Sequence, residues 1–466
     1  MRRVLHRQPD GTVIRLFQRA DLKPVGDAPQ DHIRQDADAH PALDHGHDGK
    51  ILPRCEPDVR PYLRLLQQIG DFGLSAVLQQ QERQSVQGPD VDRLLLRFTL
   101  PVALSSIVQQ LFNAADTAVV GSFGSVDALA AVGTNTEIAA LVVTVSAGLS
   151  IGANVLLSGQ IGRGETGKTH DALQAEMYLA ALIGVLGLLP GRFAAVPLLR
   201  LIRTPAAIFN DAAQYLRIYL LGYPFLLLYD FGASALRARG DSRYPFLALV
   251  ISGIANVVFN LFFVIVFRMG VAGVAIATDI SAILSAILVL HRLTEDELFR
   301  FTFRTPKLSL CTAGEILKIG LPSAVQGAVF CFANIFVQAS VNRFGETAIT
   351  GSTIAMNFEY FTYYIITAFG QTAATFTSQN HAAGQLGRCK RILWLCLGLS
   401  TLCSSIPIFT IVLFCDAFSG LFTTETAVIE YAAVRILCIL LFEPVCNLYE
   451  IPAGVLRGSG HALYLR

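Results

Sequence analysis

From Leu94 to the end of the chain, apolar stretches long enough to cross a bilayer follow one another with short interruptions. The hydrocarbon core of a membrane is about 30 Å thick, so a helix needs about 20 predominantly apolar residues to cross it. Inside lipid every backbone polar group must find a partner within the protein, which leaves helices and closed barrels as spanning structures. Hydrophobic residues make up 53% of the 466 residues and charged residues 15%. The length of the apolar runs therefore predicts an all-α polytopic membrane protein.

Ten membrane-spanning helices are predicted, and the charges between them indicate their orientation. Arg and Lys gather in alternate loops, near residues 163–168, 237–243, 292–318 and 388–391. Because positive residues stay on the cytoplasmic side, we expect the N-terminus and the linker at residues 294–314 to lie inside the cell. The predicted spans are residues 94–121, 128–161, 171–200, 207–235, 244–267, 271–292, 315–342, 348–379, 390–415 and 427–454.

Residues 1–90 have a different composition, in which Arg, Asp, Gln, His and Pro dominate and no apolar run reaches spanning length. Such a composition predicts disorder. The three histidines within residues 40–48 could form a metal loop, but a solvated polar tail is the better interpretation. Because the apolar pattern begins abruptly near Val91, we also expect natural translation to start later than the first residue of this sequence.

The chain repeats itself with a nearly constant offset. Leu100-Pro101 in the first half recurs as Leu321-Pro322 in the second. The segment PFLLLYDFGASALRARGD at residues 224–241 lies over PVCNLYEIPAGVLRGSGH at residues 444–461. Each copy begins after an even number of spans, so both halves cross the membrane in the same direction and are related by an axis along the membrane normal. The repeat predicts two pseudo-symmetric six-helix lobes with substrate between them.

The second repeat is shorter than the first. The first continues past Gly240 through two further helices, whereas the second stops shortly after Gly460, at Arg466. We therefore expect the C-lobe to lack its last two helices, and a truncated reading frame is the preferred explanation. The expected organisation is a polar extension, a six-helix N-lobe, a cytoplasmic linker and an incomplete four-helix C-lobe, at residues 1–90, 91–293, 294–314 and 315–466.

The first span carries a carboxylic acid, Asp116, well inside its apolar run. An acid at the centre of an inserted helix costs about 2.5 to 3.5 kcal/mol, so such residues usually face a bundle interior or an aqueous cavity and mark ion or substrate paths. Ser105, Gln109, Asn113 and Asp116 share one helix face. We predict that Asp116 binds the coupling cation, H⁺ or a transient Na⁺, with Asn113, Gln109 and Asn256 as neutral hydrogen-bond partners. The alternative is a buried acid that only stabilises helix packing.

Residues that could contact substrate are predicted mainly in the second half. Glu359 and Tyr360 belong to the segment NFEYFTYY, whose aromatic rings could face a cationic drug. Asp230 has an acidic equivalent in the second repeat, and packing explains this pair as well as substrate contact does. For Arg237 and Arg457, which recur at predicted cytoplasmic ends, anchoring of the topology is the preferred interpretation. The predicted substrate-binding set is Glu359, Tyr360, Asn334, Gln338 and Glu450.

The composition argues against several other functions. A net charge of +1 and short basic clusters indicate no nucleic-acid partner. The nine cysteines are scattered, and neither a CxxC pair nor a Cys/His spacing predicts a metal or redox site. No nucleophile motif or phosphate loop indicates an enzyme, and no cofactor is expected. The expected partners are the lipid bilayer and small molecules, and the expected state is a monomer.

The motifs of the two repeats resemble those of the multidrug and toxic compound extrusion (MATE) transporters. The resemblance covers residues 90–466 and rests on LPVALSSIVQQLFNAADTAVVG in the first span, GLSIGANVLLSGQIGRGE at residues 148–165 and GVAGVAIAT at residues 270–278. It implies a twelve-helix fold of two six-helix lobes, located as a multi-pass protein in the plasma membrane of a bacterium. It also implies multidrug efflux, by antiport of organic cations against H⁺ or Na⁺. The family's first-helix acid falls on Asp116.

The sequence departs from the family pattern at acidic positions. Asn256 and Asn260 stand where some members have Asn-x-x-x-Asp, and Phe330 and Cys446 stand where some branches have a glutamate and an aspartate. These departures argue against a cation site built from C-lobe carboxylates, although Glu450 could substitute. A lipid or lipid-linked sugar flippase of related architecture and an inactive truncated fragment remain as alternatives.

Overall fold

The computed structural model describes residues 91–123, 126–201, 204, 206–295, 301, 309–420 and 425–461. These residues form helices and turns, with no strand among them, which confirms the all-α prediction. The predictions for residues 1–90 lie outside the described residues. In chain order the elements are α3 (Val91–Phe123), α4 (Val126–Gly162), α5 (Thr166–Leu201), α6 (Phe209–Tyr219), η1 (Leu220–Gly222), α7 (Tyr223–Arg239), α8 (Arg243–Leu261), η2 (Phe262–Val266), α9 (Gly270–Glu295), α10 (Leu310–Val341), η3 (Asn342–Phe344), α11 (Glu346–Ala382), α12 (Leu386–Leu413), α13 (Cys415–Gly420), α14 (Thr426–Cys438), η4 (Leu440–Cys446) and α15 (Asn447–Gly458).

Eight helical segments in the described part of the chain are long and apolar enough to cross a membrane. They correspond to the first seven predicted spans and to the ninth. The predicted span 348–379 lies within α11, and the predicted span 427–454 lies within the segment from α14 to α15. These two segments are not among the eight, so the count of ten spans stays a prediction.

The second half of the chain repeats the helix boundaries of the first. α4 and α11 each contain 37 residues, and the two ends of α11 follow those of α4 at one and the same interval (346 − 126 = 382 − 162). The start of α12 at Leu386 follows the start of α5 at Thr166 at this interval too (386 − 166). α3 and α10 each contain an internal proline, Pro101 and Pro322. These matches support the duplication that the sequence predicts.

The fourth predicted span is interrupted in both repeats by a proline. In the first half the 3-10 turn η1 separates α6 from α7, and Pro224 lies in the first turn of α7. In the second half Pro444 lies within η4, between α14 and α15. Proline has no backbone N–H and its ring clashes with the preceding turn, so it is tolerated where a helix begins. The break therefore belongs to the repeated architecture.

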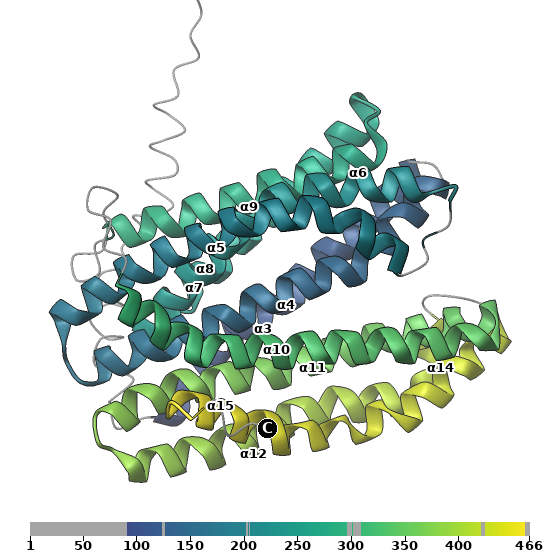
Figure 1. The fold of residues 1–466 in the computed structure, drawn as a ribbon. Coiled ribbons are helices and arrows are strands. Elements are labelled where there is room, and N and C mark those ends of the chain that lie inside the picture. Colours follow the sequence, from purple (N-terminus) through teal and green to yellow (C-terminus); the bar gives the residue numbers. More distant parts are fainter. Residues whose placement is uncertain are drawn as a thin grey trace, which may run out of the picture. The chain divides into compact units, whose positions relative to one another are not determined.

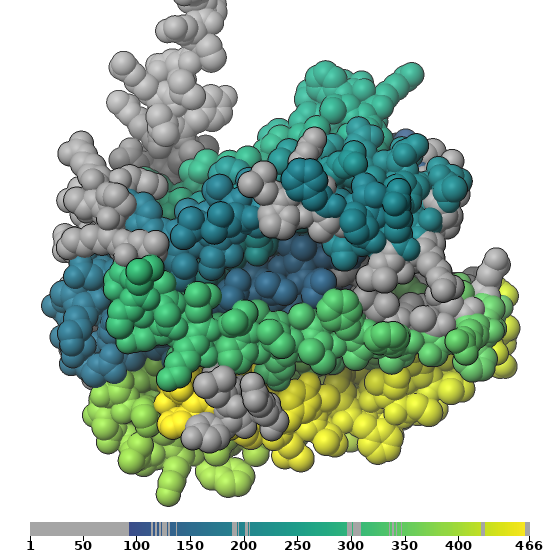
Figure 2. All heavy atoms as spheres, viewed as in Figure 1, coloured from purple at the N-terminus to yellow at the C-terminus, as the bar shows by residue number. Residues whose placement is uncertain are grey.

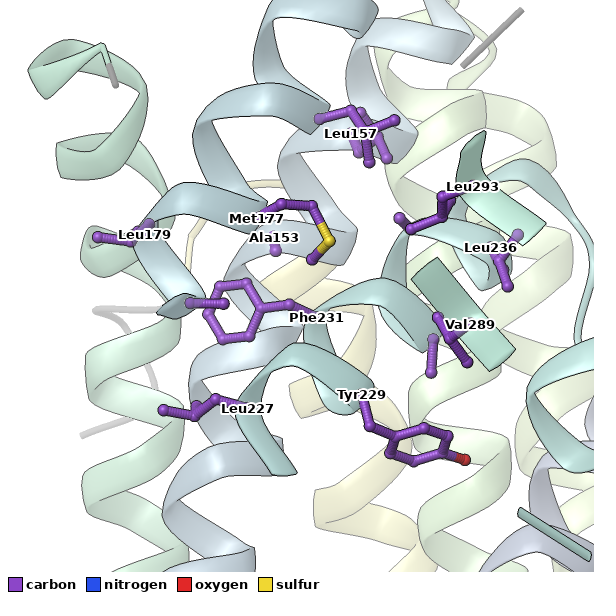
Figure 3. Packing of buried hydrophobic residues seen from close by; sticks show 14 of the residues in the cluster. Ala153, Leu157, Met177, Leu179, Leu227, Tyr229, Phe231, Leu236, Val289 and Leu293 are labelled. Carbon is purple, nitrogen blue, oxygen red and sulfur yellow. The ribbon is translucent and has the colours of Figure 1, made fainter. Parts of the chain in front are cut away.

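In the first half, α4, α5, α7 and α9 pack around large apolar side chains (Figure 3). Met177 of α5, Phe231 and Leu236 of α7, and Leu293 of α9 are each at most 2% exposed. Lipid tails are as apolar as these side chains, so close van der Waals packing holds the helices together. This packing fixes the face that α7 presents to the second half.

The two halves meet through α4 and α10 and through α3 and α11 (Figure 1). Small residues permit a close approach: a Cβ added to Gly152 of α4 would collide with the carbonyl oxygen of Ile316 on α10. A Cβ on Gly148, one turn earlier, would collide with the backbone of Ala324. Small residues at such positions are typical of tight helix pairs in membranes.

Hydrogen bonds between the halves concentrate toward the end of the molecule where α4 passes into α5 and α11 passes into α12, here called the α4–α5 end. Thr375 Oγ1 donates to Asn154 Oδ1 (2.8 Å), and Ser378 Oγ donates to the carbonyl of Val155 (2.6 Å). The halves are thus joined by hydrogen bonds most firmly at the α4–α5 end. Elsewhere between the halves, Figure 2 shows a hollow between α10 and the α5–α6 region, in which atoms of α4 are visible.

Candidate functional site

Asp116 of α3 faces α8 and α9 within the first half and is 7% exposed. Asn260 Nδ2 donates a hydrogen bond to Asp116 Oδ1, and Thr278 Oγ1 lies 3.4 Å from Asp116 Oδ2. The same Thr278 hydroxyl lies 3.0 Å from the carbonyl of Val274, so its bond to the carboxylate is the weaker of the two. The acid is therefore enclosed by protein, and its described contacts are with uncharged groups.

Two asparagines on α8 complete a cluster of oxygen atoms around Asp116. Asn260 Nδ2 lies 3.2 Å from Asn256 Oδ1, and Asn256 Nδ2 lies 3.5 Å from Thr278 Oγ1. Asn260 Oδ1 is buried and accepts no hydrogen bond from a described residue. Carboxylate, amide and hydroxyl oxygens are the ligands that hard cations prefer. A proton or a Na⁺ ion fits this donor set.

Two features interrupt regular α-helical hydrogen bonding along the helices that carry this cluster, one close to it and one several turns away. A π-helical turn, η2 at Phe262–Val266, follows directly after Asn260 and its neighbour, and such turns often occur at functional sites. On α3, Pro101 lies between the α4–α5 end and Asp116. It has no backbone N–H, so the helix lacks one hydrogen bond there. Ser105 Oγ donates to the Pro101 carbonyl at 2.8 Å. Two of the three helices that carry the cluster, α3 and α8, therefore contain or adjoin a point where regular α-helical hydrogen bonding is interrupted.

A second polar space lies between the halves, with a volume of about 100 Å³. We call it the inter-half cavity. Gln109 of α3 lines this cavity, so the structure places it apart from Asp116, two helical turns further along. The side chain of Asn113 lies outside the described residues. The polar residues that matter most for the cavity are Gln109, Asn154, Asp230, Arg237, Gln371 and Arg457.

Two acids of the predicted substrate-binding set have basic partners. Arg435 donates to both carboxylate oxygens of Glu359, at 2.7 Å and 2.9 Å. Arg457 Nη1 donates to Glu450 Oε1 at 3.2 Å. Neither carboxylate is therefore an isolated negative charge in this structure.

The other members of that set are spread along α10 and α11. Tyr360 stacks on Tyr364, with ring centroids 6.3 Å apart. Asn334 is half-buried on α10, and the side chain of Gln338 lies outside the described residues. The side chains of this set are thus distributed over two helices.

The sequence reasoning omitted two residues that touch the cluster, Asn260 and Thr278. A signal existed for Asn260, because Asn256 and Asn260 are amides one turn apart on an otherwise apolar helix. The sequence indicates a role for Thr278 less clearly. A threonine hydroxyl in an apolar helix commonly donates to a backbone carbonyl of its own helix, as Thr278 does to Val274. Among the described residues no group of three or more His, Cys, Asp or Glu could hold a metal ion.

Repeated helical halves, an oxygen-rich cluster buried inside one half and a polar cavity between the halves define a class of protein, the membrane transporters built from internal repeats. The MatE family model matches residues 101–262 and again residues 322–465. The chain belongs to this family of transporters. The model of the lipid II flippase MurJ also matches, over residues 205–347.

Curated relatives and a solved structure are similar over most of the chain. The probable multidrug resistance protein YoeA of Bacillus subtilis is 25% identical over 393 residues, covering 82% of this chain and 84% of that protein. The probable multidrug resistance protein NorM of Thermotoga maritima is 27% identical over 394 residues, covering 80% and 82%. A transporter of the MOP superfamily from Pyrococcus furiosus has a similar fold, with a TM-score of 0.77, 20% identity and coverage of 82% and 85%.

Proposed function

We propose that this chain exports organic cations and other drugs in exchange for H⁺ or Na⁺ by alternating access, with Asp116 as the residue that binds the coupling cation. The observation that carries the proposal is the hydrogen bond from Asn260 to Asp116 within a buried, oxygen-rich cluster of the first half. The two relatives named as multidrug resistance proteins support the drug substrate.

Asp116 is suited to coupling because its charge is uncompensated by a basic residue among its described contacts. A bound proton or Na⁺ neutralises the carboxylate and changes how Asn260 and Thr278 contact it. A ligand can shift a conformational equilibrium only if it binds the two states differently. We infer that neutralisation moves α3 relative to α8, with the bend near Pro101, and thereby lowers the affinity for a cationic drug.

The same proposal includes the remaining expectations for the whole protein. The chain functions as a monomer in the plasma membrane, with the α4–α5 end and the N-terminus on the cytoplasmic side, as the positions of Arg and Lys indicate. Its proposed domains are the extension at residues 1–90, the N-lobe at 91–293, the linker at 294–314 and the C-lobe at 315–466. Glu359, Tyr360, Asn334, Gln338 and Glu450 stay candidates for substrate contact.

A lipid or lipid-linked sugar flippase is the second candidate function. The match of the MurJ model over residues 205–347 favours it, whereas the MatE model matches a longer stretch in both halves. Transport of a fluorescent lipid by proteoliposomes, with no efflux of drugs, would support the flippase and contradict drug export.

The test is ethidium efflux from cells that lack their own exporters and express this chain or Asp116→Asn. We expect the wild-type chain to lower the steady-state ethidium content and Asp116→Asn to lose most of this effect, because the amide cannot take the coupling cation. Imposed gradients of H⁺ and of Na⁺ in everted vesicles then identify the coupling ion.

The matched control is Asp171→Asn, which removes an exposed acid at the start of α5. It should leave efflux unchanged. Equal efflux by wild type and Asp116→Asn would refute the coupling role, and an inactive wild-type chain that is present in the membrane would contradict the proposed export.

A further inference from the structure

Each repeat contains an acid and an arginine on one face of the same helix. Asp230 and Arg237 lie on α7, and Glu450 and Arg457 lie at the equivalent positions of α15, at the interval that relates the two repeats (450 − 230 = 457 − 237). Acid and arginine are separated by about two helical turns, so they lie on the same face, about 10 Å apart along the axis. An arginine side chain is long enough to fold back over this distance.

In the second half the pair is closed. Arg457 Nη1 donates to Glu450 Oε1 at 3.2 Å, with side chains 7% and 9% exposed respectively. Arg457 Nη2 donates to Gln326 Oε1 at 3.0 Å. The Nε N–H of Arg457 is buried and finds no acceptor among the described residues.

In the first half the equivalent pair is open. Ser146 of α4 donates to Asp230 Oδ2 at 2.6 Å and holds this carboxylate, which is also one methylene shorter than glutamate. The residue equivalent to Ser146 in the second half is Ile366, at the same interval, and it has no hydroxyl. Among the described residues, none forms a hydrogen bond or an ion pair with the Arg237 guanidinium, whose charge acts on Asp230 only over a longer distance. The first repeat thus leaves its arginine available.

Arg237 and Arg457 both line the inter-half cavity, one from each half, together with Asp230. Gln109 and Gln371, also in the lining, add amide groups that can donate hydrogen bonds. A half-buried guanidinium without a hydrogen-bonded partner is costly, whereas its planar fork matches a carboxylate through two parallel hydrogen bonds. Asp230, in the same cavity, can bind a positively charged group.

We propose that the inter-half cavity binds the charged groups of a zwitterionic organic substrate, with Arg237 binding its carboxylate and Asp230 its cationic group. Arg457 and the two glutamine amides contribute further donors from both halves. This inference rests on the proposed transport function and specifies the substrate class. It assigns Arg237 to substrate binding, where the sequence alone favoured an anchor of topology.

The experiment uses the purified full-length chain in detergent and two rhodamine dyes, one with a free carboxylate and the other its methyl ester. Both dyes carry the cationic ring system, so they differ only in the carboxylate. We measure their dissociation constants by fluorescence anisotropy. The wild-type chain should bind the free acid at least about tenfold more tightly than the ester, because the difference is a charge-assisted hydrogen-bonded pair.

Arg237→Gln should weaken binding of the free acid by about tenfold or more and leave binding of the ester within about twofold. The matched control is Arg243→Gln, which removes an exposed arginine from the first turn of α8 outside the cavity. It should change neither dissociation constant. Melting curves of all variants show whether the fold is retained.

Three results would overturn the inference: no preference of the wild-type chain for the free acid, an equal loss of both dyes in Arg237→Gln, or retention of the preference in Arg237→Gln. Binding is measured without a gradient, so the result is independent of coupling. If Asp116→Asn retains ethidium efflux while the dye preference depends on Arg237, the proposed coupling fails and the cavity assignment stands.

Discussion

Arg435 of α14 and Glu359 of α11 form an ion pair through two hydrogen bonds, Nε to Oε1 at 2.7 Å and Nη2 to Oε2 at 2.9 Å. A third bond joins Arg435 Nη1 to Ser352 Oγ at 2.6 Å. The side chains are 14% and 17% exposed, so both charges lie mostly inside the protein. An arginine within a predicted span is thus explained by an acid on the neighbouring helix.

Removing one partner of this pair should destabilise the second half. Glu359→Gln leaves the Arg435 guanidinium without its charged partner, at an expected cost of about 2 to 3 kcal/mol, below the value for fully buried pairs because both groups retain some exposure. Thermal melting followed with a thiol-reactive dye, which reports the unmasking of buried Cys389 and Cys396, measures the effect. The double variant Glu359→Gln with Arg435→Leu should recover much of the loss. A melting temperature unchanged in Glu359→Gln would mean that the pair does not hold α11 and α14 together.

Converting Asn260 to a second acid tests the cation site independently of efflux. In Asn260→Asp two carboxylates lie side by side, and two neighbouring negative charges are unfavourable unless a proton or a cation joins them. We expect the melting temperature of the variant at pH 8 to rise with the logarithm of NaCl concentration, relative to equal choline chloride, and to rise more steeply than that of wild type. Asn357→Asp, at an exposed position of α11, serves as the control. A melting temperature of the variant that does not depend on Na⁺ would argue against Na⁺ binding at Asp116 and leave the proton as the coupling cation.

Much of the fold could be predicted because a membrane-spanning helix is recognised in a sequence by the length of its apolar run and its lack of charged residues. The predicted span 128–161 corresponds to α4 at Val126–Gly162, and 348–379 to α11 at Glu346–Ala382. The break between α6 and α7 was not predicted, since hydropathy measures how apolar a segment is and is insensitive to a proline turn inside it. The sequence does carry a signal for this break in Pro224, which lies in the first turn of α7 after η1.

Part of the candidate site could be predicted for the same reason. The role of Asp116 could be predicted because burying a carboxylic acid in a membrane-spanning helix costs free energy, so such an acid usually has a function. The positions of its partners could not be derived, because helix periodicity tells which residues share a face and not which helix covers that face. Gln109 shares the face of Asp116 but lies two turns away, where it lines the inter-half cavity together with residues of α4, α7 and α11. Arg435 and Glu359 could not be paired from sequence, because their contact depends on how α11 and α14 pack.

The close contact between α4 and α10 gives a prediction about the joint between the halves. Gly152→Ala places a methyl group against the carbonyl oxygen of Ile316 and the backbone of Gly320, which cannot move aside as a side chain can. We expect a loss of about 1 to 3 kcal/mol from overpacking, seen as a lower melting temperature. Gly133→Ala on the same helix is the control, because its Cβ would meet no described atom within 4 Å. That variant should be at least as stable as wild type, since alanine favours a helix over glycine by about 1 kcal/mol. Equal melting temperatures for Gly152→Ala and Gly133→Ala would show that the halves do not pack as closely as described.

The asymmetry between the two acid–arginine pairs predicts that the inter-half cavity can be closed by making the first repeat more like the second. In the double variant Ser146→Ala with Asp230→Glu, the acid at position 230 has the length of Glu450. The Ser146 hydroxyl, which donates to Asp230 at 2.6 Å in the wild-type chain, is absent. It should then pair with Arg237 as Glu450 pairs with Arg457 at 3.2 Å. Binding of the free-acid rhodamine should weaken by at least about tenfold, because the guanidinium is occupied, and binding of the ester should weaken as well, because the acid that binds the cationic group is occupied too. The melting temperature should not fall, since the guanidinium gains a partner, and this separates pairing from misfolding. Ser146→Ala alone, which keeps the short acid, should retain most of the preference for the free acid. If the double variant binds both dyes as wild type does, Arg237 is not the group that recognises the carboxylate.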